Sequence, residues 1–161
     1  AAGVRHRLLA RLVEPAAGDE HLRSRDDILR VRGVELHGVL VPDKGFVEAT
    51  DALLERLRDG SAVVPSLWRF EVANVLAVAE RRGRITEAQS VRFSRLLGAL
   101  PIDVDDDPAT LQELVHTARH HGLSAYDASY LLLALRLGAP LATLDGRLRD
   151  AAKTAGVGLV P

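Results

Sequence analysis

The stretch "GLSAYDASYLLLALRLGAPLATLD", residues 122 to 145, contains the pattern of a helix, a turn and a strand. Ser124 is a favoured residue for a helix N-cap, and Gly138 is a favoured residue just after a helix C-terminus. The apolar segment that follows predicts a strand. Two aspartates, Asp127 and Asp145, interrupt this apolar run. An isolated charge in apolar surroundings is costly, so both carboxylates need a compensating group.

Helices and strands continue to alternate on both sides of this stretch. Ser66 and Thr86 are N-cap candidates, and Asp107 precedes Pro108, a residue favoured in the first helical turn. The predicted helices cover residues 46–60, 66–83, 85–100, 108–122, 124–138 and 146–156, and the predicted strands cover 61–66, 101–107, 140–145 and 157–160. This order predicts an α/β fold, in which helices cover both faces of a parallel sheet.

The first 45 residues show no sustained hydrophobic period. "LLARLV", residues 8–13, suggests a short helix, and "GVELHGVLV", residues 33–41, suggests a strand. We therefore divide the chain into an atypical N-terminal segment, residues 1–45, and one domain, residues 46–161. The N-terminal segment is expected to be partly disordered or to form the first strand.

The composition is that of an ordinary globular domain, with 161 residues, 47% hydrophobic and 27% charged. No cysteine is present, which excludes disulfides and thiolate metal sites and fits a reducing compartment. No apolar run reaches membrane-spanning length, and the start lacks the apolar core of a secretory signal. We therefore expect a cytoplasmic protein without membrane association. The net charge of −1 gives no overall basic field, so nucleic-acid binding would need local clusters of arginine.

A third carboxylate occurs in "FEVANVLAVA", residues 70–79, where Glu71 and Asn74 share one helix face. A structural role is open for Glu71, which Arg69 or Asn74 would then satisfy. The same is true of Asp127, which completes the capping-box pattern that Ser124 begins.

Asp145 also has two interpretations. It precedes a predicted helix and so fits an N-cap. It also follows a predicted parallel strand, at the end where open α/β sheets bind their ligands. Taken together, Glu71, Asp127 and Asp145 outnumber the arginines near enough to pair with them. A shared Mg²⁺ or Mn²⁺ ion would satisfy all three, because these hard cations prefer carboxylate and water oxygens. Such an ion activates water and stabilises phosphoryl transition states.

Other common functional motifs are absent, and the histidine pair fits a helix end. The sequence contains no H-E-x-x-H, P-loop, G-x-S-x-G or G-x-G-x-x-G motif. The pair His120 and His121 suits the C-terminal end of a helix. A phosphatase or nucleotide-binding domain with a coincidental acidic cluster is an alternative, but a phosphatase of the haloacid dehalogenase type would need a D-x-D pair at the end of its first strand.

Three segments carry a family resemblance: "VVPSLWRFEVANVLAVAERRGRIT", "HGLSAYDASYLLLALRLGAPLATLDGRL" and "AAKTAGVGLV". Together they resemble the PIN domain, in particular the VapC-type toxin ribonucleases of bacterial toxin–antitoxin pairs. The similarity runs from about residue 47 to the C-terminus. It implies a three-layer α/β/α PIN-like fold with a central parallel sheet, and a Mg²⁺- or Mn²⁺-dependent endoribonuclease that hydrolyses RNA phosphodiester bonds.

The resemblance also implies roles for single residues. Glu71, Asp127 and Asp145 match three of four acidic metal-binding and catalytic positions, with Asn74 and Thr143 in support. It further implies a cognate antitoxin protein and a homodimer. Arginines near the motifs are candidates for contacts with the RNA backbone: Arg69, Arg81, Arg82, Arg84 and Arg147.

The fourth acidic position departs from the family pattern. The family has a first strand that ends in aspartate, followed by a small residue and then serine or threonine, and no such triplet occurs here. Glu35 is a substitute candidate, with His37 in place of the hydroxyl residue. A second alignment puts Arg32 at the aspartate position, where its charge would repel a metal ion. The sequence therefore predicts a metal-dependent ribonuclease of reduced activity. The alternative is an impaired PIN-fold module that binds RNA or an antitoxin without efficient cleavage.

Overall fold

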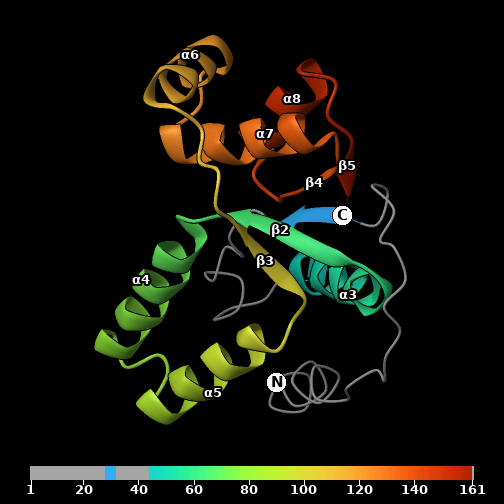
Figure 1. Cartoon of the computed structure of the whole chain (residues 1–161). Coiled ribbons are helices and arrows are strands. Elements are labelled where there is room, and N and C mark those ends of the chain that lie inside the picture. Colours follow the sequence, from blue (N-terminus) through green and yellow to red (C-terminus); the bar gives the residue numbers. More distant parts are fainter. Residues whose placement is uncertain (1–27, 32–43, 161) are drawn as a thin grey trace.

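The structure is a computed structural model, and it describes residues 28–31 and 44–160. Five parallel strands form one sheet in the order β3-β2-β1-β4-β5 (Figure 1). The strands are β1 (Ile28–Val31), β2 (Ser61–Pro65), β3 (Ile102–Asp105), β4 (Leu141–Ala142) and β5 (Leu159–Val160).

Strand β1 lies at the centre of the sheet. Ile28 is opposite Ser61 of β2, and Val31 is opposite Ala142 of β4. The chain runs from β1 through β2 to β3 on one side, and then crosses to β4 and β5 on the other. A ligand crevice in an open parallel sheet forms where the strand order reverses, at the carboxyl ends of the strands. Here that point lies beside β1.

Helices cover both faces of this sheet. Figure 1 shows α7 and α8 on one side of the sheet and α3 on the other, while α4 and α5 form a helical pair beside it. The helices are α3 (Lys44–Asp59), α4 (Trp68–Arg81), α5 (Glu87–Gly98), α6 (Leu111–His121), α7 (Ala125–Leu137) and α8 (Gly146–Thr154). The predicted α/β class with a parallel sheet is therefore confirmed. Within the residues described, no helix is both long and apolar enough to span a membrane.

Local capping explains where several of these helices begin. Thr86 caps α5 through a capping box with Gln89, and Ser124 caps α7 by accepting from the backbone N–H of Asp127. Helix α7 ends at Gly138, whose φ of 59° lies in the left-handed region that glycine adopts without strain. These boundaries agree with the sequence prediction.

Two predicted caps are wrong. Helix α4 begins after Leu67, which makes no side-chain capping bond, so Ser66 is not its cap. Helix α6 begins after Thr110 and not at Pro108, because Thr110 and Glu113 form a complete capping box. The side chain of Asp107 instead accepts a hydrogen bond from Arg136. A better cap three residues further along the chain determines where α6 starts.

The N-terminal segment contributes the central strand. That strand is Ile28–Val31, whereas the predicted strand at residues 33–41 and the predicted helix at 8–13 lie outside the described residues. The strand pairs with β2 and β4, so at least this part of residues 1–45 belongs to the sheet. The division into residues 1–45 and 46–161 otherwise stays a prediction.

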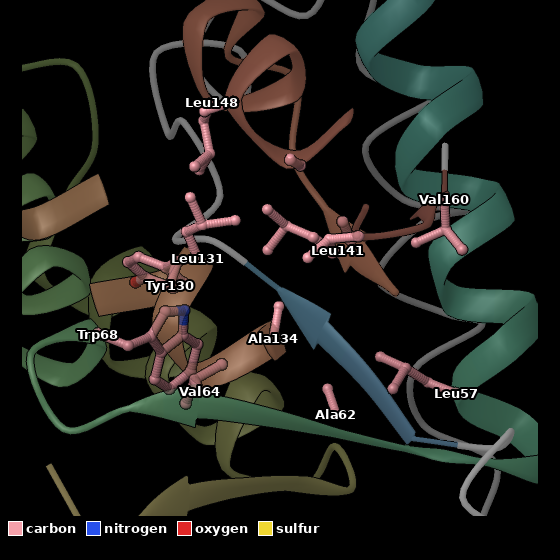
Figure 2. Packing of buried hydrophobic residues seen from close by; sticks show 14 residues of the cluster. Leu57, Ala62, Val64, Trp68, Tyr130, Leu131, Ala134, Leu141, Leu148 and Val160 are labelled. Atoms are coloured by element: carbon pink, nitrogen blue, oxygen red, sulfur yellow. The ribbon is translucent and has the colours of Figure 1, made fainter. Parts of the chain in front are cut away.

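The core lies between the sheet and the helices that pack on it. Tyr130 and Leu131 of α7 and Leu141 of β4 are fully buried, and Trp68 of α4 belongs to the same cluster (Figure 2). Burying side chains of this size stabilises the fold by roughly 2 kcal/mol each. Because α7 is buried along much of its length, its first turn is held in a fixed place relative to the carboxyl ends of the strands.

Candidate functional site

Glu71 lies in the first turn of α4, just after the carboxyl end of β2. Its side chain is half-buried. The hydroxyl of Tyr130, on α7, donates a hydrogen bond to Oε2 of Glu71 at 2.5 Å. The predicted structural partners were Arg69 or Asn74, but the observed partner comes from another helix. Both Arg69 and Asn74 are exposed.

Asp127 lies in the first turn of α7 and is held by Ser124. The Ser124 hydroxyl donates to Oδ2 of Asp127 at 2.7 Å and accepts from the Asp127 backbone N–H at 3.1 Å. Ser124 is therefore the N-cap of α7, as predicted, and Asp127 contacts the hydroxyl of this cap where the capping-box pattern predicted its backbone N–H. A carboxylate here is also favoured by the helix dipole. Because the side chain is half-buried, these bonds restrict its orientation.

Asp145 follows β4 and is the N-cap of α8. Its Oδ1 accepts from the Leu148 backbone N–H at 2.8 Å, and its own N–H donates to Oγ1 of Thr143 at 3.1 Å. Thr143 is buried, and its carbonyl accepts from Nη1 of Arg149 at 2.9 Å. The N-cap interpretation of Asp145 is therefore confirmed. The same contacts hold its carboxylate next to the carboxyl end of β4.

The three carboxylates lie on elements that meet at one edge of the sheet. Glu71 follows β2 and Asp145 follows β4, and these strands flank β1 in parallel. Asp127 and Tyr130 are one turn apart on α7, and Tyr130 joins this helix to Glu71. Within the described residues, however, no three His, Asp or Glu side chains are close enough together to hold a metal ion. Each of the three carboxylates accepts a hydrogen bond from the protein, which offsets part of its charge.

The three candidate ligands are nevertheless chemically suited to a hard cation. All three candidate ligands are carboxylates, each is anchored by a neighbouring donor, and Mg²⁺ and Mn²⁺ prefer such oxygens. The fourth candidate, Glu35, lies outside the described residues, as does Arg32. The next residue of the sequence after β1 is Arg32.

The arginines proposed for RNA binding are all exposed. They comprise Arg69 on α4, Arg147 on α8, and three at or beyond the C-terminal end of α4, namely Arg81, Arg82 and Arg84. Sequence reasoning missed Arg149, which is half-buried and donates to the carbonyl of Thr143. The spacing could have identified Arg149, because it follows Asp145 by one helical turn.

Sequence reasoning also missed Tyr130. The tyrosine in the apolar run "ASYLLLAL" was a signal, because a buried tyrosine usually finds a hydrogen-bond partner for its hydroxyl. The partner itself was beyond prediction, because Glu71 is 59 residues away along the chain.

Comparisons with known proteins concern the family and the fold of the chain. The family model described as "PIN domain" matches residues 39–154, more than two thirds of the chain, and the match begins after β1. Ribonuclease VapC3 from Pyrobaculum aerophilum is 33% identical over 86 residues, which cover 52% of this chain and 66% of that relative. The crystal structure of PAE2754 from Pyrobaculum aerophilum is similar, with a TM-score of 0.60 and 25% identity over 82% of this chain and 90% of that one. These matches confirm the resemblance to VapC-type PIN proteins and the three-layer α/β/α fold it implies, and the chain belongs to the PIN-domain family.

Proposed function

We propose that this chain is a metal-dependent endoribonuclease of the VapC type, the toxin of a toxin–antitoxin pair. The observation that carries the proposal is that Glu71 follows β2 and Asp145 follows β4, the two strands that flank β1, while Tyr130 connects the helix of Asp127 to Glu71. Ligands of open α/β sheets bind at the carboxyl ends of the strands. The name of the relative Ribonuclease VapC3 supports RNA as the substrate.

Glu71, Asp127 and Asp145 would hold Mg²⁺ or Mn²⁺, with Glu35 as the proposed fourth ligand. The cation, when bound, would activate a water molecule and neutralise the charge of the scissile phosphate. The protein's own part is to fix the carboxylates, through the Tyr130 hydroxyl on Glu71 and the Ser124 hydroxyl on Asp127. One of the carboxylates orients the attacking water and accepts its proton.

Positive charge around the acidic edge would bring the RNA backbone to it. Arg147 on α8 is exposed and follows Asp145 closely, while Arg69 is exposed beside Glu71. Each phosphate contact adds a salt-dependent contribution to binding.

We further propose that the chain binds a cognate antitoxin protein, forms a homodimer and acts in the cytoplasm. Asn74 and Thr143 would support the metal site.

A second candidate function is a PIN-fold module of reduced catalytic power that binds RNA or an antitoxin. Two observations favour it. Strand β1 ends at Val31 and the next residue is Arg32, and the family match begins only at residue 39. A lost ligand loosens both the binding and the geometry of a metal ion.

Cleavage of a mixed RNA pool tests the proposal. The wild-type chain should cleave slowly with Mg²⁺ or Mn²⁺ and stop with EDTA, and Asp145→Asn should remove this activity. Asp150→Asn is a matched control, because Asp150 is an exposed residue of the same helix and pairs only with Lys153 at 3.5 Å among the ion pairs described. Cleavage that persists in EDTA or in Asp145→Asn would contradict a nuclease site here. RNA binding without cleavage in the wild type would favour the second candidate.

A further inference from the structure

The link between Tyr130 and Glu71 goes beyond what a folded core requires. Tyr130 is fully buried, and Figure 2 shows its ring in the core cluster between Trp68 and Leu131. A phenolic hydroxyl buried at this depth needs a hydrogen-bond partner. A backbone carbonyl would serve that need. The observed partner is instead the carboxylate of Glu71, from another helix, at 2.5 Å.

The bond also orders the carboxylate of Glu71. The glutamate side chain has several rotatable bonds, and ordering it costs conformational entropy. A short bond from a hydroxyl to a charged carboxylate is among the stronger hydrogen bonds in proteins, and it is directional. It engages Oε2 and leaves Oε1 as the second acceptor of the group. The bond therefore fixes where Glu71 presents its remaining oxygen.

Helix α7 carries both this anchor and a proposed ligand. Asp127 precedes Tyr130 by one turn, and residues at that spacing lie on one helix face. The Ser124 hydroxyl holds Asp127 at 2.7 Å, so the helix sets the positions of two carboxylates at once. The buried side chains of α7 hold the helix in the core, which fixes the positions of Asp127 and Tyr130.

We propose that Tyr130 is a positioning residue, whose hydroxyl holds the Glu71 carboxylate in the orientation in which it binds a divalent cation. This role rests on the proposed function, because it requires Glu71 to be a ligand. Partners that orient metal ligands contribute about 10- to 100-fold to metal affinity. The hydroxyl of Tyr130 thus raises the metal affinity of the site through Glu71, without contacting the ion.

The chain contains its own control for this idea. It has two tyrosines, and the other, Tyr126, is 66% exposed and lies one turn earlier on α7. Tyr→Phe at either position removes one hydroxyl and keeps the ring. Trp68, the single tryptophan, is buried one turn before Glu71 on α4, so its fluorescence reports whether the core around Tyr130 is intact.

Manganese binding to the full chain tests the proposal without any RNA. Free Mn²⁺ is titrated and followed by its electron paramagnetic resonance signal in wild type, Tyr130→Phe, Tyr126→Phe, Glu71→Gln and the Tyr130→Phe/Glu71→Gln pair. We expect Tyr130→Phe to weaken binding about tenfold, with Tyr126→Phe within about twofold of wild type. The emission of Trp68 should stay the same in both tyrosine variants. In the Glu71→Gln background, Tyr130→Phe should add no further loss.

The outcomes separate this proposal from the function on which it rests. Wild-type affinity in Tyr130→Phe together with weakened binding in Glu71→Gln would overturn the positioning role and keep the metal site. Equal losses from Tyr130→Phe with and without Glu71, or a shifted Trp68 emission, would indicate a general packing effect and also overturn it. Unchanged Mn²⁺ affinity in Glu71→Gln would remove Glu71 from the site, and both proposals would fail.

Discussion

The hydroxyl of Tyr130 on α7 donates to Oε2 of Glu71 on α4 at 2.5 Å, across 59 residues of sequence. This contact explains how a carboxylate is accommodated inside the apolar run "FEVANVLAVA". A half-buried charge is costly without a strong partner. A fully buried hydroxyl is costly for the same reason, so each group satisfies the other.

This contact should be measurable as a coupling in stability. In a double-mutant cycle of Tyr130→Phe and Glu71→Gln, we expect a coupling of about 1 to 2 kcal/mol in the free energy of unfolding, since a hydrogen bond to a charged group contributes about this much. Urea unfolding in the absence of metal, at neutral pH, gives the four values. Tyr126→Phe should change stability by less than about 0.5 kcal/mol because Tyr126 is exposed. Strictly additive losses would show that the bond contributes nothing.

Arg136 links the end of α7 to the end of β3. It donates to Asp105, the last residue of that strand, and to Oδ2 of Asp107 at 2.6 Å. The hydrogen bond that Arg136 donates to Asp105 is the largest of the effects that raise the pKa of Arg136 above its ordinary value. A cation with a raised pKa contributes its stability below its ordinary pKa, so the arginine itself adds no pH dependence near neutrality.

The two aspartates beside Arg136 should differ in importance. The side chain of Asp105 is 16% exposed and that of Asp107 is 88% exposed. We expect Asp105→Asn to lower the free energy of unfolding by about 1 kcal/mol and Asp107→Asn by only a few tenths, because solvent weakens exposed pairs. Urea midpoints at low salt test the order. A larger loss from Asp107→Asn would contradict it.

The capping box of α6 should make part of the stability depend on pH. The Thr110 hydroxyl donates to Glu113 at 2.7 Å, and with the Thr110 backbone N–H it lowers the pKa of Glu113 below its ordinary value of 4.5. A carboxylate with a lowered pKa stabilises the fold above its unfolded pKa, and this contribution is lost as pH falls through the folded pKa. The loss therefore occurs below about pH 4.5.

Glu113→Gln should remove that pH dependence. Glutamine keeps the capping geometry without the charge, as Gln89 already does in the box with Thr86 on α5. The urea midpoints of wild type and Glu113→Gln should therefore differ more at pH 7 than at pH 3.5. Gln89→Glu is the reverse control and should add a pH dependence in the same acidic range. A constant difference between wild type and Glu113→Gln would show that the box does not titrate.

Much of the fold follows from local sequence signals. Thr86, Ser124 and Gly138 mark helix boundaries that the structure has, because capping residues act within a few positions of the chain. The choice of Asp107 as a cap failed for a physical reason. Its carboxylate pairs with Arg136, 29 residues away, and Thr110 with Glu113 supplies a better cap nearby.

The site was predictable only in part. The motifs placed Asp127 and Asp145 at the starts of helices, which the structure confirms. They did not reveal that Tyr130 anchors Glu71, since that contact depends on how α4 and α7 pack. The central strand was also missed. "ILRV" is too short to show a period, and pairing with β2 and β4 is what makes it a strand.

The residue after β1 offers a gain-of-function test. One of the two possible alignments puts Arg32, the residue after Val31, at the position of the family's first aspartate, and the other puts Glu35 there. The following expectations hold for the first alignment. Arg32→Asp should raise Mg²⁺-dependent RNA cleavage about tenfold or more, and Arg32→Asn, which only removes the positive charge, should raise it less. The gain should disappear when Asp145→Asn is added. If instead Glu35→Gln abolishes cleavage and Arg32→Asp gives no gain, Glu35 is the fourth ligand.

We propose that Glu71, Asp127 and Asp145 bind one divalent cation between them. Crystals of the wild-type chain grown or soaked with Mn²⁺ would test it through the anomalous scattering of manganese. We expect one strong anomalous peak within ligand distance of all three carboxylates, about 2.0 to 2.6 Å from their oxygens. Asp127 and Asp145 should turn toward the ion, while Glu71 keeps its bond to Tyr130. The peak should be absent in Asp127→Asn crystals soaked in the same way. A manganese peak elsewhere, such as beside His116 and His120, with none between the three carboxylates, would contradict the claim.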